Sequence, residues 1–311
     1  MIASSDEPRR QLSTQHPADD AGGDRQPMAA IASWPGLAPA AHANGVPLSA
    51  HQLAQFATYR RVLLEWNARF NLTAITDPDE IERRLFLDAL LLVPLIDRLT
   101  GGNEARLVDI GSGAGFPGLP LAIARPELTM TLIDATGKKV AFLRQLIMEL
   151  SLPRVQAIHA RAEDVARQPN HRGAYDLATA RAVASLPALV ELTMPLLRLG
   201  GHALLPKGID IAGELAAGRR AASLVGATIL DAGLAPDSST RIVIVRKRQP
   251  TPDRYPRRAG IPAHQPLGTT IDPRTPNPGG TRQAPAEMGA GGAAGSRGAV
   301  GAAAGHLRVA S

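Results

Sequence analysis

The sequence predicts a doubly wound α/β fold, in which a mainly parallel seven-stranded sheet carries helices on both faces and follows an N-terminal helical module. Three observations support this prediction. Short apolar runs alternate with helical stretches across the middle of the 311-residue chain, which is the pattern of a parallel sheet. A glycine-rich turn follows the first apolar run, at residues 109–115. The segments at both ends have no hydrophobic period from which a core could be packed.

The N-terminal segment, residues 1–46, is rich in Ala, Pro, Gly, Asp and Gln, and we expect it to be disordered. An N-terminal helical module is expected over residues 47–100. Its first helix starts after Ser49, a favourable N-cap residue, and carries apolar residues at helical spacing. A loop at residues 71–78 separates this helix from a second one, which we expect over about residues 79–98.

The domain expected over residues 101–248 contains six apolar runs that predict strands. These runs are residues 105–110, 129–134, 155–160, 175–180, 202–207 and 241–247. Helices are expected between most of them, including one that ends near Ala124 and one at Lys138–Leu150. Beyond this domain we expect a basic tail over residues 249–268 and a disordered low-complexity extension over residues 269–311.

Composition limits the chemistry and the location of the protein. The chain has no cysteine, which excludes disulfides, metals ligated by cysteine and a thiol nucleophile. The first 27 residues lack the apolar core of a signal peptide, and the apolar stretch at residues 85–96 is too short to span a bilayer. We therefore expect a soluble, cytoplasmic protein with no membrane contact.

The motif that carries chemistry is the turn Asp109-Ile-Gly111-Ser-Gly113-Ala-Gly115, which joins the first strand to its helix. Glycines allow a tight turn and let a ligand approach the backbone closely. Residues 113–118 match the GxGxxG string of dinucleotide sites, but two residues out of register. An acid at the end of the strand, two residues before the first glycine, would repel a pyrophosphate, whereas it suits a cation such as the amino group of S-adenosylmethionine.

A second acid follows at the end of the next strand. Asp134 lies nineteen residues after Gly115, where a carboxylate can accept hydrogen bonds from both hydroxyls of a ribose. The DxGxGxG turn followed by this acid favours a Rossmann-like class I methyltransferase that uses S-adenosylmethionine. A nicotinamide dinucleotide site and a turn without a ligand are the alternatives.

Two features that the sequence lacks narrow the range of possible methyl acceptors. Without cysteine, the covalent route to carbon-5 of a pyrimidine is closed. Residues 179–186, after the fourth strand, lack the Asn/Asp-Pro-Pro-aromatic tetrapeptide that is usual in enzymes methylating exocyclic amines of nucleic acids. A ring nitrogen with a free lone pair needs only alignment with the methyl group, so proximity would supply most of the rate. We expect no catalytic nucleophile or base, and no metal.

Short motifs between residues 48 and 267 occur in an order that is typical of one family. They are Trp66-Asn-Ala-Arg-Phe-Asn71-Leu-Thr, Asp77-Pro-Asp-Glu, Arg84-Leu-Phe-Leu-Asp88-Ala and the runs at residues 108–123, 132–143, 161–165, 179–186, 206–208 and 246–267. This set resembles the RsmG family, also called GidB, of small-subunit ribosomal RNA guanine-N7 methyltransferases. Members commonly have Arg-His-Ile-Leu-Asp in the second helix, and Leu85 stands at the histidine position here.

The resemblance implies positions for the cofactor and for the incoming base. Gly111 and Phe116 would lie against S-adenosylmethionine, with Phe116 in place of the usual leucine. Ala162 and Glu163 would border the adenine, and Arg181 would lie beside the cofactor and the base. The expected cofactor-binding residues are therefore Asp109, Gly111, Gly113, Gly115, Phe116, Asp134, Ala162, Glu163 and Arg181.

Positive charge is concentrated at the C-terminal end of the chain. The net charge is −2 for residues 1–50, +1 for residues 51–245 and +7 for residues 246–311. Prolines are expected to keep the tail extended, so that its guanidinium groups follow a phosphate backbone while Tyr255 stacks on a base. Lys207 follows the fifth strand, on the side of the sheet where ligands bind. The expected RNA-binding residues are Lys207, Arg246, Lys247, Arg248, Arg254, Tyr255, Arg257 and Arg258.

Asn71 and Asp88 are polar residues among apolar neighbours. Hydrogen bonding within caps and loops is one interpretation of both, and substrate positioning is the other.

The sequence thus predicts an S-adenosylmethionine-dependent enzyme that methylates guanine N7 in 16S ribosomal RNA by direct in-line transfer. The resemblance implies an acceptor in the decoding-region loop and an assembled small ribosomal subunit as substrate, and we expect a monomer to act on it. Three alternatives remain open. They are a methyltransferase with a small-molecule or protein acceptor, a NAD-dependent oxidoreductase, and an RNA-binding protein of the ribosome without enzymatic activity.

Overall fold

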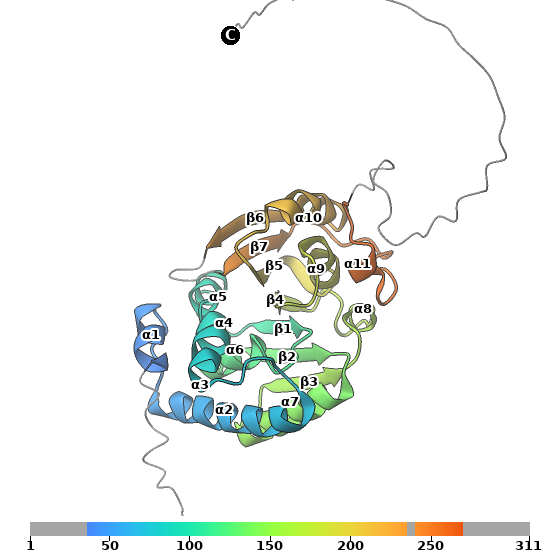
Figure 1. The fold of residues 1–311 in the computed structure, drawn as a ribbon. Helices are drawn as coiled ribbons and strands as arrows, with labels where there is room; N and C mark the ends of the chain where they lie inside the picture. The colour runs from blue at the N-terminus through green and yellow to red at the C-terminus, as the bar shows by residue number, and fades with distance from the viewer. Residues whose placement is uncertain (1–35, 235–239, 270–311) are drawn as a thin grey trace, which may run out of the picture. The chain divides into compact units, whose positions relative to one another are not determined.

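The computed structural model describes residues 36–234 and 240–269, which surround a seven-stranded sheet (Figure 1). The strands are β1 (Arg106–Ile110), β2 (Thr129–Asp134), β3 (Val155–His159), β4 (Tyr175–Ala180), β5 (Leu197–Lys207), β6 (Ala227–Leu234) and β7 (Arg241–Lys247). Their order across the sheet is β3-β2-β1-β4-β5-β7-β6. β1 to β5 pair in parallel, whereas β7 is antiparallel to both β5 and β6. The predicted mainly parallel, seven-stranded sheet is confirmed.

Helices precede the sheet and connect its strands, as predicted. They are α1 (Leu37–Ala43), α2 (Ala50–Phe70), α3 (Pro78–Ile81), the π-helix η2 (Glu82–Leu87), α4 (Asp88–Leu90), α5 (Val93–Thr100), α6 (Gly118–Ala124), α7 (Gly137–Glu149), α8 (Ala162–Val165), α9 (Leu186–Thr193), α10 (Ala212–Leu224) and α11 (Ile261–His264). No helix within residues 36–234 and 240–269 is long and apolar enough to cross a membrane.

Two hydrophobic clusters cover the two faces of the sheet. Successive strand residues point to opposite faces, so Leu107 belongs to one cluster and Val108 to the other. The first cluster joins Leu107 to apolar residues of α2, α5, α6 and α7, and the second joins Val108 to those of α9 and α10. Both residues are almost fully buried, as expected for a parallel sheet with helices on both faces.

Helix α1 shows that the expected disorder of residues 1–46 is wrong for the end of this segment. Leu37 and Ala41 lie four residues apart on one face of α1, and together with Val46 they are buried and belong to the first cluster. The helix packs against η2, so the apolar side chains find a partner that is remote in sequence. Ordered structure therefore begins before residue 47, and residues 1–35 lie outside the described residues.

Helix α2 begins where its N-cap residue predicts. Ser49 and Gln52 form a capping box in which each side chain bonds the other residue's backbone. The amide of Gln52 also donates to the carbonyl of Ile123 at 2.9 Å, which fixes α2 against the end of α6. Asn71 is the C-cap in a left-handed conformation, with φ 48°, so its position in the loop is explained by capping.

The second predicted helix, over residues 79–98, is not continuous. The chain forms α3, η2, α4 and α5 in succession, with Pro94 at the start of α5. Proline is favourable in the first turn of a helix and unfavourable further in, which explains the break before α5. A π-helix such as η2 rotates the side chains that follow it relative to an α-helix, and such turns are frequent at functional sites.

Residues 249–268 form a folded segment that we call the C-terminal strap. After β7 the strap runs against α9 and ends in α11, and its Thr251 and Tyr255 are buried. The expectation that prolines keep this tail extended is therefore wrong. Residues 270–311, which hold most of the expected low-complexity extension, lie outside the described residues.

Candidate functional site

The glycine-rich turn lies at the carboxyl end of β1, held against β2. The N–H groups of Gly111 and Ser112 both donate to the carbonyl of Ile133, at 2.7 and 3.1 Å. Gly111, Gly113 and Gly115 have φ values of 66°, 58° and 95°, which side-chain-bearing residues rarely adopt. A Cβ at Gly113 would meet no atom closer than 3.8 Å, so the backbone there borders open space. The turn therefore presents bare backbone to any ligand in this space.

Asp134 closes the turn from the end of β2. Its Oδ2 accepts from the N–H of Gly113 at 2.9 Å, and its Oδ1 accepts from the N–H of Thr136 at 2.8 Å. A carboxylate offers about four acceptor positions, so both oxygens can also receive ligand hydroxyls. The Asp134 side chain thus stabilises the turn and can also bind a ligand at the turn.

Asp109 is completely buried beneath the turn. Its Oδ2 accepts from the N–H of Gly118 at 3.2 Å, and its Oδ1 has no hydrogen-bond partner among the described residues. Burial raises the pKa of this carboxyl to about 7, although the nearby Ser112 hydroxyl, the N–H of Gly118 and the charge of Arg181 oppose the rise. A cationic ligand at the turn would supply the missing attraction, as the sequence predicts for the S-adenosylmethionine amino group. The glycine cradle, the orphaned buried oxygen and the strand-end carboxylate together fit this cofactor.

Arg181 follows β4 and lies next to the turn. Its guanidinium lies over the ring of Phe116, 5.3 Å from the ring centroid, and donates to the carbonyl of Arg84 at 3.3 Å. Burial lowers the pKa of Arg181, while its charge is attracted by the carboxylates of Asp88 and Asp109. This arginine therefore connects the glycine turn with a second group of residues around Asp88.

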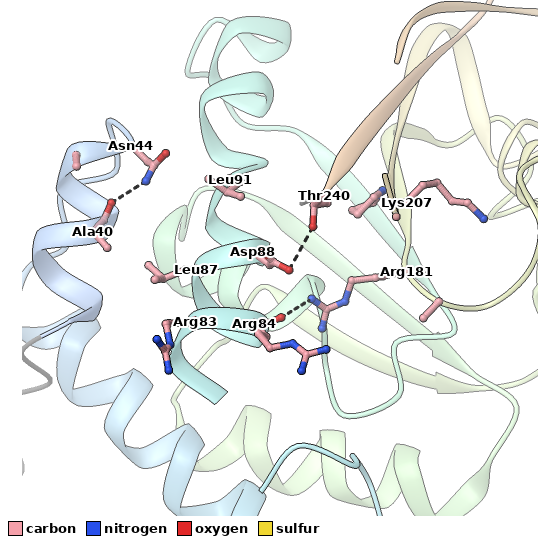
Figure 2. Close-up of a pocket in the computed structure, with 14 residues that line it drawn as sticks. Ala40, Asn44, Arg83, Arg84, Leu87, Asp88, Leu91, Arg181, Lys207 and Thr240 are labelled. Atoms are coloured by element: carbon pink, nitrogen blue, oxygen red, sulfur yellow. Dashed lines mark hydrogen bonds between the residues drawn. The ribbon is translucent and has the colours of Figure 1, made fainter. Parts of the chain in front are cut away.

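That second group lines a pocket of about 710 Å³ at the carboxyl ends of β4 and β5 (Figure 2). The lining comes from α1, η2, α4, the segment after β4, the end of β5 and the start of β7. It consists of Ala40, Ala43, Asn44, Arg83, Arg84, Leu87, Asp88, Leu91, Arg181, Ala182, Pro206, Lys207, Gly208 and Thr240. The volume accommodates a nucleotide, and the position at strand carboxyl ends is typical of ligand sites in α/β sheets.

Cationic residues dominate the pocket. Arg83, Arg84, Arg181 and Lys207 line it together with a single carboxylate among the described lining residues, that of Asp88. Arg83 and Arg84 are largely exposed and are held by Glu80 at 3.6 and 3.1 Å. Such a set favours an anionic ligand such as the phosphate backbone of a nucleic acid.

Arg83, Arg84 and Thr240 line the pocket although the sequence did not predict them as site residues. Arg84 begins a family motif and Arg83 directly precedes it, but nothing local shows that η2 directs them to the same space as Arg181. Thr240 is brought there because β7 is antiparallel, so that the start of β7 adjoins the end of β5 at Lys207.

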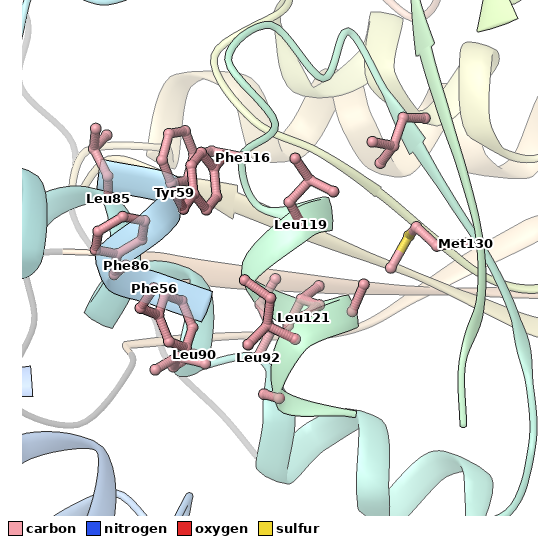
Figure 3. Packing of buried hydrophobic residues seen from close by; sticks show 14 of the residues in the cluster. Phe56, Tyr59, Leu85, Phe86, Leu90, Leu92, Phe116, Leu119, Leu121 and Met130 are labelled. Atoms are coloured by element: carbon pink, nitrogen blue, oxygen red, sulfur yellow. The ribbon is translucent and has the colours of Figure 1, made fainter. Parts of the chain in front are cut away.

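Phe116 and Leu85, the two departures from the family pattern, both pack into the core (Figure 3). Phe116 stacks on Tyr59 at 5.2 Å between ring centroids, and Phe86 and Phe56 extend the aromatic cluster. Leu85 is 6% exposed. Both positions therefore contribute apolar packing to the first hydrophobic cluster.

Ala162 and Glu163 begin α8, after β3, and both are buried. The carboxylate of Glu163 accepts from the backbone N–H of Gly260 in the strap at 2.8 Å. The strap therefore reaches the loop that the resemblance assigns to the adenine.

Several residues of the expected RNA-binding tail are engaged within the protein. Lys247 is buried and donates to the carbonyl of Leu197 at 2.7 Å, and Tyr255 is 6% exposed. Arg257 binds both carboxylate oxygens of Glu191, which is fully buried. The expectation that Tyr255 is available to stack on a base is wrong, because its ring is packed in the second cluster, and Lys247 and Arg257 are likewise held by internal partners.

The remaining basic residues differ in their surroundings. Arg248, Arg254 and Arg258 are exposed, and Arg246 is partly buried. Lys207 lines the pocket but also binds Glu214 at 2.9 Å. The tail begins at the end of β7, which is remote from the pocket. Arg246 pairs there with His202 of β5, whereas the pocket lies at the other end of β5, near Lys207.

The strand order, the antiparallel β7, the glycine turn after β1 and the carboxylate ending β2 define a class I methyltransferase that depends on S-adenosylmethionine. Residues 52–233 match the GidB family, described as rRNA small subunit methyltransferase G. The chain is 49% identical over 226 residues to ribosomal RNA small subunit methyltransferase G of Chloroflexus aggregans, covering 72% of this chain and 93% of that protein. The corresponding protein of Desulfitobacterium hafniense is 43% identical over 226 residues, covering 71% and 92%. The chain belongs to the GidB family, and the resemblance seen in its motifs is confirmed.

Proposed function

We propose that this chain methylates N7 of a guanine in 16S ribosomal RNA of the small ribosomal subunit, with S-adenosylmethionine as the methyl donor. The observation that carries the proposal is the cationic pocket that shares Arg181 with the glycine turn. Family membership supports the RNA substrate, because the relatives are named for it. The decoding-region loop as the target, a cytoplasmic location and action as a monomer belong to the same proposal.

The residues at the turn hold the cofactor in this proposal. Gly111 and Gly115 shape the turn, the bare backbone at Gly113 borders the methionine part of the cofactor, and Asp109 attracts its amino group. Asp134 accepts from the ribose hydroxyls. Phe116, Ala162 and Glu163 complete the site, the last two beside the adenine.

The bound cofactor supplies an electrophilic methyl group. Guanine N7 carries a lone pair and no proton, so no residue has to act as a base at this atom. The protein therefore has to orient the base and exclude water, which accords with a chain that has no cysteine nucleophile. Arg181 performs the orienting step, since its guanidinium is fixed by Phe116 and by the carbonyl of Arg84 between the two parts of the site.

Outside the pocket, the exposed residues Arg248, Arg254 and Arg258 contact the phosphate backbone in this proposal. Lys207 and Arg246 contribute from partly buried positions. Their contribution is expected to depend strongly on salt, as is usual for phosphate contacts.

A strain that lacks the gene tests the proposed function. Mass spectrometry of nucleosides from its 16S ribosomal RNA should show the loss of 7-methylguanosine, and the wild-type gene should restore it. A gene encoding Asp134→Ala is the matched control, and it should not restore the nucleoside. Unchanged 7-methylguanosine in the deletion strain would overturn the proposal.

A further inference from the structure

The C-terminal strap is attached to one short segment of the body, the residues that begin with α8. The carboxylate of Glu163 accepts from the N–H of Gly260 at 2.8 Å, and the guanidinium of Arg167 donates to the carbonyl of Pro256. Arg172 donates to three more strap carbonyls, those of Thr251, Pro252 and Tyr255. Three side chains within residues 163–172 therefore hold the strap over most of its length.

These bonds are made to the backbone of the strap. Gly260 has φ 85°, a left-handed conformation that glycine adopts readily, and in this conformation its N–H meets Glu163. Glu163 is 7% exposed, and a buried carboxylate is costly unless it accepts hydrogen bonds. The strap and α8 therefore stabilise each other through this bond, whatever side chains the strap carries.

Helix α8 depends on such contacts for its position. It is a single turn, Ala162–Val165, and a helix this short has little stability of its own. Val165 packs in the second hydrophobic cluster, which also contains Tyr255 of the strap. Just before α8, the N–H of Ala160 donates to the carbonyl of Asp134 at 3.1 Å. The segment held by the strap is thus joined directly to the strand end that receives the ribose in the proposed function.

We propose that the C-terminal strap is part of the cofactor site, where it holds α8 beside the adenine of S-adenosylmethionine. Glu163 and Arg172 are positioning residues in this inference, because their side chains bind the strap and the strap fixes the backbone of α8. The inference rests on the proposed function, which places the adenine at Ala162 and Glu163. It gives the strap a role in binding the cofactor that is separate from the phosphate contacts of its exposed arginines.

The physical basis of this role is preorganisation. A segment that is already fixed in its binding conformation loses little freedom when the ligand binds, whereas a loose segment has to be ordered at the expense of affinity. Loosening the strap should therefore weaken binding of the cofactor without any change in the groups that contact it. The adenine takes no part in methyl transfer, so binding in the ground state and in the transition state should weaken equally.

Calorimetry of the full-length protein with adenosylhomocysteine tests the proposal. Glu163→Ala removes the acceptor for the N–H of Gly260 and should raise the dissociation constant about tenfold, as expected for a lost hydrogen bond to a charged group. Glu163→Gln keeps an acceptor oxygen and should restore the dissociation constant to within about threefold of wild type. Asp164→Ala, the matched control, removes the exposed carboxylate of the next residue and should stay within about twofold of wild type.

A double-mutant cycle separates positioning from direct contact between Glu163 and the adenine. Arg172→Ala releases three strap carbonyls and should by itself weaken binding about tenfold. Independent effects would multiply to about 100-fold, whereas two residues that hold the same strap should together give less than about 30-fold. Arg167→Ala, which removes an exposed residue bound to the strap, replaces Arg172→Ala in the cycle if the latter does not fold.

Methyl transfer to assembled small subunits gives a second readout. Glu163→Ala should raise KM for S-adenosylmethionine about tenfold and leave kcat within about twofold of wild type. Wild-type affinity for adenosylhomocysteine in Glu163→Ala and Arg172→Ala, or effects that multiply in the double variant, would overturn the inference. A wild-type protein that binds adenosylhomocysteine and leaves 16S ribosomal RNA unmethylated would refute the proposed function, and calorimetry would still decide the role of the strap.

Discussion

The pocket and the C-terminal strap are both rich in arginine, but they use it differently. In the strap, Arg257 binds the buried Glu191, and Arg172 of the body donates to the carbonyls of Thr251 and Tyr255. In the pocket, Arg83 and Arg84 are largely exposed and face an open volume of about 710 Å³. The density of positive charge therefore does not identify the binding surface. The two regions differ in exposure: the guanidinium of Arg257 is bonded to a fully buried carboxylate, whereas Arg83 and Arg84 pair with Glu80 at the surface and stay largely exposed beside the pocket.

The two regions also lie differently on the sheet. The pocket is at the carboxyl ends of β4 and β5, where ligands bind in such folds. The strap starts at the far end of β7 and comes back to the ligand edge at Gly260, where it binds Glu163. Variants that remove the internal bonds of the strap, such as those of Arg257, should therefore change stability, whereas variants in the pocket should change methyl transfer.

The largest effect is expected from Arg257→Ala. It leaves the fully buried Glu191 without its cationic partner, which should lower the free energy of unfolding by about 3 kcal/mol. Arg258→Ala removes the same charge from an exposed neighbour and should change stability by less than about 0.5 kcal/mol. Urea denaturation of the two variants makes the comparison. Equal effects would show that the strap is not held by this ion pair.

Arg181→Ala should slow single-turnover methyl transfer about 100-fold, because a charged, oriented donor between the two parts of the site is lost. The free energy of unfolding should fall by only about 1 kcal/mol, from the lost contact with the Phe116 ring. Arg181→Lys keeps the charge without the planar fork and should be intermediate in rate. A loss of stability as large as that of Arg257→Ala would assign Arg181 to the framework instead of to the reaction.

Asp134→Ala should weaken binding of adenosylhomocysteine by about 2 kcal/mol, because the proposed acceptor of the ribose hydroxyls is removed. Calorimetry measures this change directly. Asp134→Asn keeps one oxygen for the turn and should bind with intermediate affinity. Unchanged affinity in both variants would mean that the ribose lies elsewhere.

The smallest expected effect is a pH dependence of stability from Asp109. Burial raises the pKa of this carboxyl to about 7 in the folded protein. Between about pH 4 and pH 7, Asp109 keeps its proton in the folded state and loses it in the unfolded state. The contribution of this carboxyl to stability is therefore present at low pH and is lost as pH rises through 7. The difference in unfolding free energy between wild type and Asp109→Asn should fall by about 1 kcal/mol from pH 6 to pH 8. A difference that does not change with pH would refute the raised pKa.

The parts of the fold that local patterns encode were predictable from the sequence. β1, the glycine turn and β2 follow from short apolar runs, three glycines and two strand-end acids within about thirty residues. The start of α2 follows from the capping residues Ser49 and Gln52. In each case the residues that determine the structure are close in sequence.

The rest depends on partners that are remote in sequence. α1 is ordered because η2 covers its apolar face, and Tyr255 is buried because the strap folds back onto the body. β6 was missed because its apolar residues are interrupted, and its pairing with β7 shifts register between Ile229 and Asp231. Arg83, Arg84 and Thr240 were missed as pocket residues for the same reason, since η2, the end of β4 and the start of β7 meet only in the folded chain.

A crystal structure of the protein with adenosylhomocysteine and guanosine monophosphate tests the proposed site most directly. We expect the adenosyl group over Gly111–Gly115 with its ribose on Asp134. The guanine should lie in the pocket, with Arg181 between the two ligands. An adenosyl group bound away from the glycine turn, or a guanine that does not enter the pocket, would contradict the proposed site.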